Sequence, residues 1–180
     1  MKKLSLVIAA AVALALAAST ARAQTTSSGT LTVTATVAST IYLIFNTDAS
    51  GVTLTGSGTN AAALAFGSVA AYTTPPSHVT QTNSGSSFTI STPVDVNVTE
   101  YNSTSASFNL TAQLGTADST NTWKVGGTTV TNSPAVTIGS NLAYQANLSG
   151  GAVETVAITI PSTESAGTIS NTINFVATSN

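Results

Sequence analysis

The sequence contains no cysteine, and only 6% of its residues are charged. The absence of cysteine excludes disulfide bonds and metal sites built on thiolates. A fold without these supports has to be stabilised by a buried apolar core and by backbone hydrogen bonds. The chain also has a single histidine, which is the side chain most often used as a general acid or base.

Basic residues are almost absent once the N-terminal segment is set aside. Lys124 is then the only one, so with six acidic residues the net charge is 1 − 6 = −5. Nucleic-acid-binding proteins neutralise several phosphates with lysine and arginine, and anionic membrane surfaces attract basic clusters. The composition therefore excludes both nucleic acids and anionic membrane surfaces as partners.

The N-terminal segment has the three parts of a secretory signal peptide. Lys2 and Lys3 form the basic region, Leu4–Ala18 is apolar or small apart from Ser5, and Ala21–Ala23 matches the cleavage pattern. We expect cleavage after the last of these alanines, which leaves 180 − 23 = 157 residues for the mature chain. No later run is long and apolar enough to span a membrane. The prediction is a secreted protein, in the periplasm or at the cell surface, with no membrane span in the mature chain.

Alternation of apolar and polar residues with a period of two is the dominant pattern of the mature chain, and it is typical of half-buried strands. In the clearest case, Leu31, Val33, Ala35 and Val37 alternate with threonines over residues 30–37. Other segments with this pattern are Leu64–Val69, Phe88–Ile90, Val94–Val98, Phe108–Leu114, Val156–Ile160 and Ile173–Ala177.

Two further segments complete the strand prediction. Ile41–Phe45 is an unbroken apolar run, which we interpret as a strand buried on both faces. Gly126 and Gly127 separate Trp123–Val125 from Thr128–Val130 by the spacing of a two-residue hairpin.

The pattern as a whole predicts an all-β protein. We expect an immunoglobulin-like β-sandwich of roughly seven to nine antiparallel strands. The predicted organisation is a signal peptide over 1–23, an N-terminal strand or extension over 24–38, and a sandwich domain over 39–180.

Residues that commonly carry catalysis form no recognisable arrangement. His78 follows Pro75-Pro76 in a predicted loop, where it is either a general base or an exposed loop residue. The sequence has no G-x-S-x-G motif, and its carboxylates are too dispersed to indicate a glycosidase pair. We therefore predict that the protein is not an enzyme and needs no cofactor or metal.

Two weaker patterns leave alternatives open. Asn46, Asp48, Ser50 and Gly51 resemble the first half of a calcium-binding loop, but the twelfth position is Ser57 instead of glutamate. Either a calcium ion binds near Asp48, or the segment is a plain Asx turn.

Aromatic residues are few. Trp123, together with the tyrosines at 42, 72, 101 and 144, forms either a stacking platform for sugars or ordinary packing.

Both ends of the mature chain carry short motifs of a known kind. The first stretch is SGTLTVTATV at residues 28–37, followed by LAFGSV at residues 64–69. The second is Ile160-Pro161 followed by AGTISNTINFVAT at residues 166–178. Together these stretches resemble spore coat protein U-like domains, which belong with the subunits of chaperone-usher pili, or fimbriae.

The resemblance implies an immunoglobulin-like sandwich that lacks one strand and therefore has an apolar groove beside its C-terminal strand. A periplasmic chaperone fills this groove first, and the N-terminal extension of the next subunit then replaces the chaperone, by strand addition. The implied donor residues are Leu31, Val33, Ala35 and Val37. The implied groove wall is Ile173, Phe175 and Ala177.

Alternation alone does not distinguish a strand donated to another subunit from the first strand of the chain's own sandwich. We expect a secreted structural or adhesive surface subunit, pilin- or coat-like, that self-assembles by donor-strand pairing. The alternative is a self-contained extracellular β-sandwich that binds a carbohydrate or another ligand.

Overall fold

A computed structural model of the protein describes residues 27–102, 104–146 and 151–180. The predicted signal peptide, residues 1–23, lies outside them. The chain divides between Thr36 and Val37 into two units. In the described part of the first unit, residues 27–36, every residue is exposed and none belongs to a strand.

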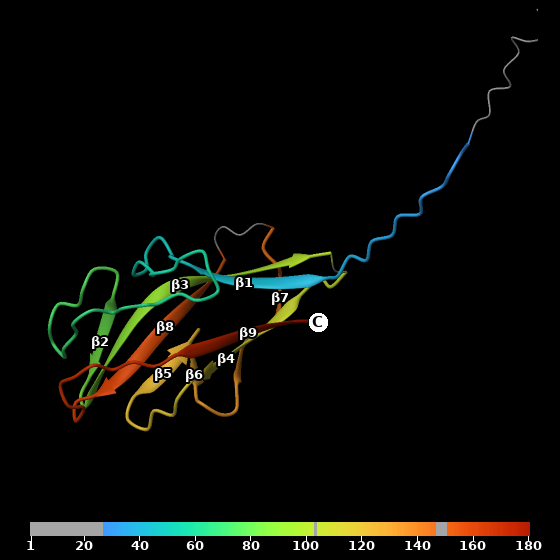
Figure 1. Ribbon diagram of the computed structural model, residues 1–180. Helices are drawn as coiled ribbons and strands as arrows, with labels where there is room; N and C mark the ends of the chain where they lie inside the picture. The colour runs from blue at the N-terminus through green and yellow to red at the C-terminus, as the bar shows by residue number, and fades with distance from the viewer. Residues whose placement is uncertain (1–26, 103, 147–150) are drawn as a thin grey trace, which may run out of the picture. The chain divides into compact units, whose positions relative to one another are not determined.

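The second unit is all-β, with nine strands and no helix among its described residues (Figure 1). The strands are β1 (Thr40–Asn46), β2 (Thr80–Ser84), β3 (Ser87–Tyr101), β4 (Phe108–Leu114), β5 (Thr122–Val125), β6 (Thr128–Val130), β7 (Val136–Leu142), β8 (Ala152–Pro161) and β9 (Ile173–Ser179). In the part of the chain that the structure covers, no helix is long and apolar enough to cross a membrane.

The strands form two antiparallel sheets. The larger sheet has the order β1-β3-β8-β5-β6, with β2 paired to the first half of β3, and the smaller sheet has the order β7-β4-β9. Phe88 and Ile90 of the larger sheet join Ala112 and Leu114 of the smaller sheet in one buried cluster. The two sheets therefore share an apolar interior.

Strand β4 shows how the sequence pattern becomes packing. Phe108, Leu110, Ala112 and Leu114 are all buried, while the residues between them are half-buried. The predicted strands at β4, β8 and β9 and the hairpin between β5 and β6 are confirmed.

Strand β3 joins two segments that the sequence pattern separates, because Pro93 does not interrupt it. Strand β1 pairs with residues 95–101 of β3, and β2 pairs with residues 87–91. Neither strand reaches Pro93 on that side, so the missing N–H of the proline removes no bond of either ladder. The carbonyl of Pro93 is also approached so closely by Gly51 that a Cβ there would lie 2.1 Å from the oxygen.

Two parts of the strand prediction are wrong. Leu64–Val69 is not a strand, although Phe66 and Val69 pack against the core. Gly67 has φ +78°, a left-handed conformation that breaks an extended strand. Strands β2 and β7 were not predicted by the pattern. Residues 30–37 have no strand structure in the described chain, and their pairing as a donor strand stays a prediction.

Candidate assembly edge

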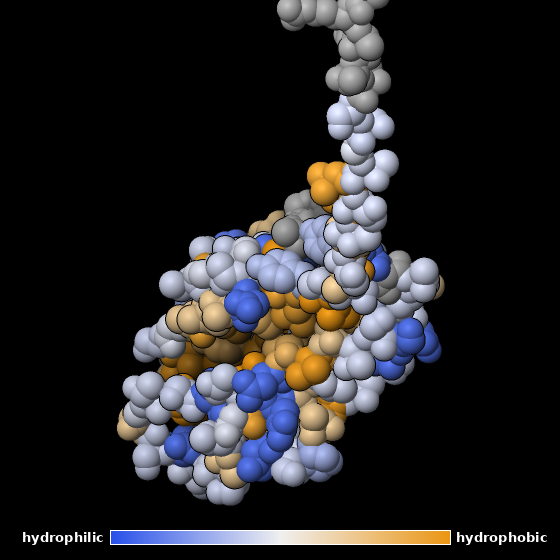
Figure 2. Space-filling view, turned by 45° about the vertical axis from the view of Figure 1, so that its right-hand side comes forward, coloured by the Kyte–Doolittle hydropathy of each residue, from blue (hydrophilic) through white to orange (hydrophobic). Residues whose placement is uncertain are grey.

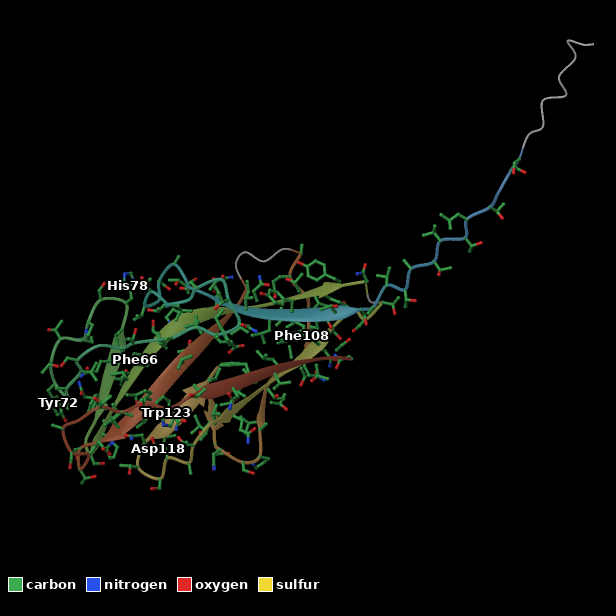
Figure 3. The ribbon with its side chains drawn as sticks, viewed as in Figure 1. Phe66, Tyr72, His78, Phe108, Asp118 and Trp123 are labelled. Carbon is green, nitrogen blue, oxygen red and sulfur yellow. The ribbon has the colours of Figure 1, made fainter. Side chains whose placement is uncertain are left out.

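The polar residues singled out in the sequence do not converge. The Nδ1 atom of His78 lies 3.2 Å from the carbonyl oxygen of Ser50, and the side chain is exposed. In Figure 3, His78 lies at the upper edge of the strands, and Asp118 and Trp123 lie near their lower edge. Within the described ranges, no three residues of the types His, Cys, Asp and Glu are grouped so that they could hold a metal ion.

Asp48 forms an Asx turn. Its Oδ1 accepts hydrogen bonds from the backbone N–H of Ser50 at 2.8 Å and from the Ser50 hydroxyl at 2.6 Å. These bonds lower the pKa of Asp48. Burial, together with the charge of Asp48, raises the pKa of the neighbouring Asp95. The turn is therefore present, and calcium binding near Asp48 stays a prediction.

Trp123 does not offer a stacking surface, which corrects the idea of a sugar platform centred on it. Its side chain is only 6% exposed, and its Nε1–H donates to Asp118 Oδ2 at 2.8 Å. Asp118 also accepts the backbone N–H groups of Thr120 and Asn121. These bonds lower the pKa of Asp118 against the opposing effect of its partial burial, which is the largest single contribution. The hydrogen bonds of Asp118 therefore fix the turn that precedes β5, beside the core residue Trp123.

The backbone edge of β9 is open on the side away from β4. Gly115 N–H donates to the carbonyl of Thr172, and Asn180 N–H donates to the carbonyl of Ser107. Because backbone groups in a strand alternate in direction, the even-numbered residues of β9 bond to β4. The N–H and C=O groups of Ile173, Phe175 and Ala177 therefore point outward, and nothing among the described residues bonds to them.

Strand β9 is also regular along its whole length. Its register with β4 runs without a shift from Phe108–Ser179 to Leu114–Ile173. It contains no charge, proline or glycine. Charged side chains, prolines and bulges are the features by which proteins usually prevent an edge strand from pairing with another chain, and β9 has none of them.

The other edges are irregular, covered at one end or short. Strand β7 has register shifts against β4 at Leu110, and its Asn141 has a left-handed φ of +54°. On β1, the N–H and C=O of Phe45 bond to Thr59 and Gly58, so a loop covers that end of the strand. Strand β6 has only three residues.

The interior beside β9 is only half-covered. Ile173, Phe175 and Ala177 share one face of β9, and each is half-buried against core residues. From β1, the half-buried side chains of Ile41, Leu43 and Phe45 pack against the same interior. Figure 2 turns this side toward the viewer and shows an apolar hollow there. We call the space between these two sets of side chains the β1–β9 groove.

An aromatic contact crosses the groove. The rings of Phe45 and Phe175 lie edge to face, with centroids 5.2 Å apart and an angle of 66° between their planes. The floor of the groove is formed by buried side chains of β3 and β4, which are Val96, Val98, Phe108 and Leu110.

The structure thus places the predicted groove-wall residues on one face of an open edge strand. The predicted donor residues Leu31, Val33, Ala35 and Val37 lie in an exposed segment without strand structure.

Sequence reasoning missed the β1 wall of the groove. The apolar run Ile41–Phe45 suggested a strand buried on both faces, and Ile44 is indeed only 2% exposed. The alternate residues Ile41, Leu43 and Phe45 are only half-buried, however. Their two-residue spacing was the available signal, and the apolar Ile44 concealed it.

Comparison with known proteins provides no relative. No family model matches the sequence, and neither the curated proteins nor the solved structures contain a match.

Proposed function

We propose that the protein is a secreted structural subunit, pilin- or coat-like, with an immunoglobulin-like sandwich fold, and that it assembles by strand pairing. Residues 30–37 of one copy add to β9 of another. The observation that carries this proposal is the open, regular and uncharged edge of β9 beside a half-covered apolar interior.

The N-terminal segment has the side chains that such a groove requires. Leu31, Val33 and Val37 are 87%, 81% and 70% exposed. Burying each of them would contribute about 1–3 kcal/mol before the cost of ordering the chain. Residues 24–47 contain no charged side chain, so no ionised side chain has to be desolvated.

Chain connectivity favours pairing between copies over pairing within one copy. Only Ala38 and Ser39 separate residue 37 from β1, which itself forms a wall of the groove. A two-residue hairpin to β1 favours glycine, asparagine or aspartate, because its central residues adopt positive φ. A parallel arrangement beside β1 would need a crossover of a dozen residues or more. A donor segment from a second copy is not joined to this β1 by a short loop, so neither the turn residues nor the crossover length restricts it.

An open apolar edge is an aggregation hazard before assembly. The proposal therefore includes a periplasmic chaperone that covers the edge of β9 with an extended segment of its own. It also includes removal of the signal peptide, so that the N-terminal segment is free to pair.

The test uses the secreted protein that begins at Gln24. We expect oligomers or fibres by size-exclusion chromatography and electron microscopy, and we expect their loss when Gln24 to Val37 are deleted. In the matched control, Thr32, Thr34 and Thr36 are changed to serine on the opposite face of the donor, and assembly is retained. A deletion variant that is folded, soluble and as oligomeric as the parent protein would refute the proposal.

A ligand-binding role has one observation in its favour. Tyr42 and Tyr101 are 40% and 47% exposed. Tyr42 lies opposite Thr99, and Tyr101 lies two residues further along β3, so both tyrosines share one face. Such a pair suits stacking against a sugar ring. Glycan binding by a monomer that is lost in Tyr42→Ala and retained in Tyr72→Ala would support this alternative.

A further inference from the structure

The side chains of the β1–β9 groove differ in size along its length. Phe45 and Phe175 extend into it from opposite walls and touch. At the next inward position of β9 the wall residue is Ala177, which has only a methyl group. The level of the two rings therefore has less room for a side chain of an added strand than the level of Ala177.

The donor segment contains one matching irregularity. Three of its four apolar residues are large, namely Leu31, Val33 and Val37, and the fourth is Ala35. We propose that Ala35 lies directly opposite Phe175 in the assembled protein and thereby sets the register of the added strand. This inference rests on the proposed function.

Other registers are sterically or chemically worse. A shift by one residue would turn the donor threonines toward the apolar interior. A shift by two residues in either direction would place Val33 or Val37 against the rings. Overpacking of this kind typically reduces stability by about 1–3 kcal/mol.

The register does not depend on strand direction. With Ala35 opposite Phe175, an antiparallel donor has Val33 beside Ala177, and a parallel donor has Val37 there. Either way, a valine fills the space beside the smallest wall residue.

Backbone geometry at this level directs the donor to β9. The outward N–H and C=O of Phe45 on β1 already bond to Thr59 and Gly58. The outward groups of Phe175 on β9 have no such partner among the described residues. At the level of the rings, the donor can therefore pair with β9 alone.

Disulfide trapping in the assembled protein tests the register, since the natural chain has no cysteine. Ala177→Cys is combined in turn with Leu31→Cys, Val33→Cys, Ala35→Cys and Val37→Cys, with Phe175 left intact. Residues directly opposite have Cα atoms about 4.5–5.5 Å apart, within disulfide range, whereas diagonal neighbours are about 7–8 Å apart.

We expect an intermolecular disulfide with position 33 or with position 37, at least tenfold more abundant than with positions 31 and 35. Dominant trapping at 31 or 35, or no trapping at all in assembled protein, would overturn the register.

A second test of the register uses side-chain size. Ala35→Leu should slow assembly more than tenfold, and Phe45→Ala in the same chain should restore it by removing one ring. Thr34→Leu places the same leucine side chain on the outward face and should assemble normally. Phe45→Leu is the milder replacement if Phe45→Ala does not fold, as judged by circular dichroism.

The outcomes separate the two proposals. If the parent protein and all variants stay monomeric, strand pairing itself is wrong. If the parent assembles and Ala35→Leu assembles equally fast, strand pairing stands and the register is wrong.

Discussion

Strands β7 and β9 are the two outer strands of one sheet, and both have seven residues. They differ in regularity. Strand β7 shifts its register twice against β4, whereas β9 keeps one register throughout. A bulged edge presents a broken row of hydrogen-bonding groups, and a regular edge presents a continuous one. The same sheet therefore has one edge that resists a new strand and one that can accept it.

Specific contacts maintain the irregularity of β7. Asn141 N–H donates to Asn109 Oδ1 at 3.0 Å, and Asn180 Nδ2 donates to Asn141 Oδ1 at 3.0 Å. Neither β7 nor β9 contains a charged residue. The two edges thus differ in backbone geometry and not in charge.

The largest expected effect comes from proline in β9. Val176→Pro removes an N–H that bonds to β4, and it should lower the free energy of unfolding by about 1–3 kcal/mol. Ala177→Pro removes an N–H that points outward, so it should leave stability nearly unchanged and prevent assembly. Urea unfolding and size-exclusion chromatography measure the two effects. Equal destabilisation by both prolines would contradict the assignment of the outward groups.

A change in β7 should act on stability and not on assembly. Asn141→Val places a β-branched residue at φ +54° and should lower the free energy of unfolding by about 1–2 kcal/mol. Asn141→Gly tolerates that conformation and is the matched control for the lost side chain. The assembly rate is compared under conditions in which variant and parent are both fully folded. A changed rate in Asn141→Val would then show that β7 takes part in assembly, against the prediction.

Glu154 should make stability depend on pH. Its burial raises the pKa above the ordinary value of 4.5, so the folded state binds the proton more tightly than the unfolded state. The stability contributed by the protonated form is fully present below pH 4.5 and is lost as the pH rises through the raised pKa. We expect Glu154→Gln to raise the thermal midpoint at pH 7 by a small amount and to leave it unchanged at pH 3. An equal effect at both values would exclude titration as the cause.

The smallest effect is expected at Val176, whose side chain is 55% exposed on the face away from the core. Val176→Thr keeps the β-branched shape and should change stability by about 0.5 kcal/mol or less. Assembly should be unchanged, because the groove uses the opposite face of β9. Loss of assembly in this variant would show that the outer face takes part.

Alternation was sufficient to predict strands wherever one face is buried. Strand β4 is the clearest case, since its four apolar residues are all buried. Strand β2 was missed because TQTNS has no apolar residue, and β7 was missed because Gly139-Ser140-Asn141 interrupts the alternation that begins with Val136 and Ile138. Pairing with β3 and β4 holds them in the sheets, and a single sequence contains no signal for such pairing.

The candidate site was only half predictable. Alternation predicted that Ile173, Phe175 and Ala177 share one face of a strand, and the family resemblance implied their role as a groove wall. The opposite wall was hidden by Ile44, which is buried on the outer face of β1 opposite the buried Asn97. The contact between Phe45 and Phe175 joins residues 130 positions apart, and only the folded arrangement of the sheets reveals it.

Pro93 separates two ladders on one side of β3, while β8 pairs with residues on both sides of the proline along the other side. Strands β1 and β2 occupy the same side of β3 without meeting, and at the boundary between them β3 has no amide proton. Amide exchange along β3 can therefore report on each half separately. Loosening of β1 would leave the protection of residues 87–91 in place, so one end of the domain can adapt to an incoming strand while the other remains closed.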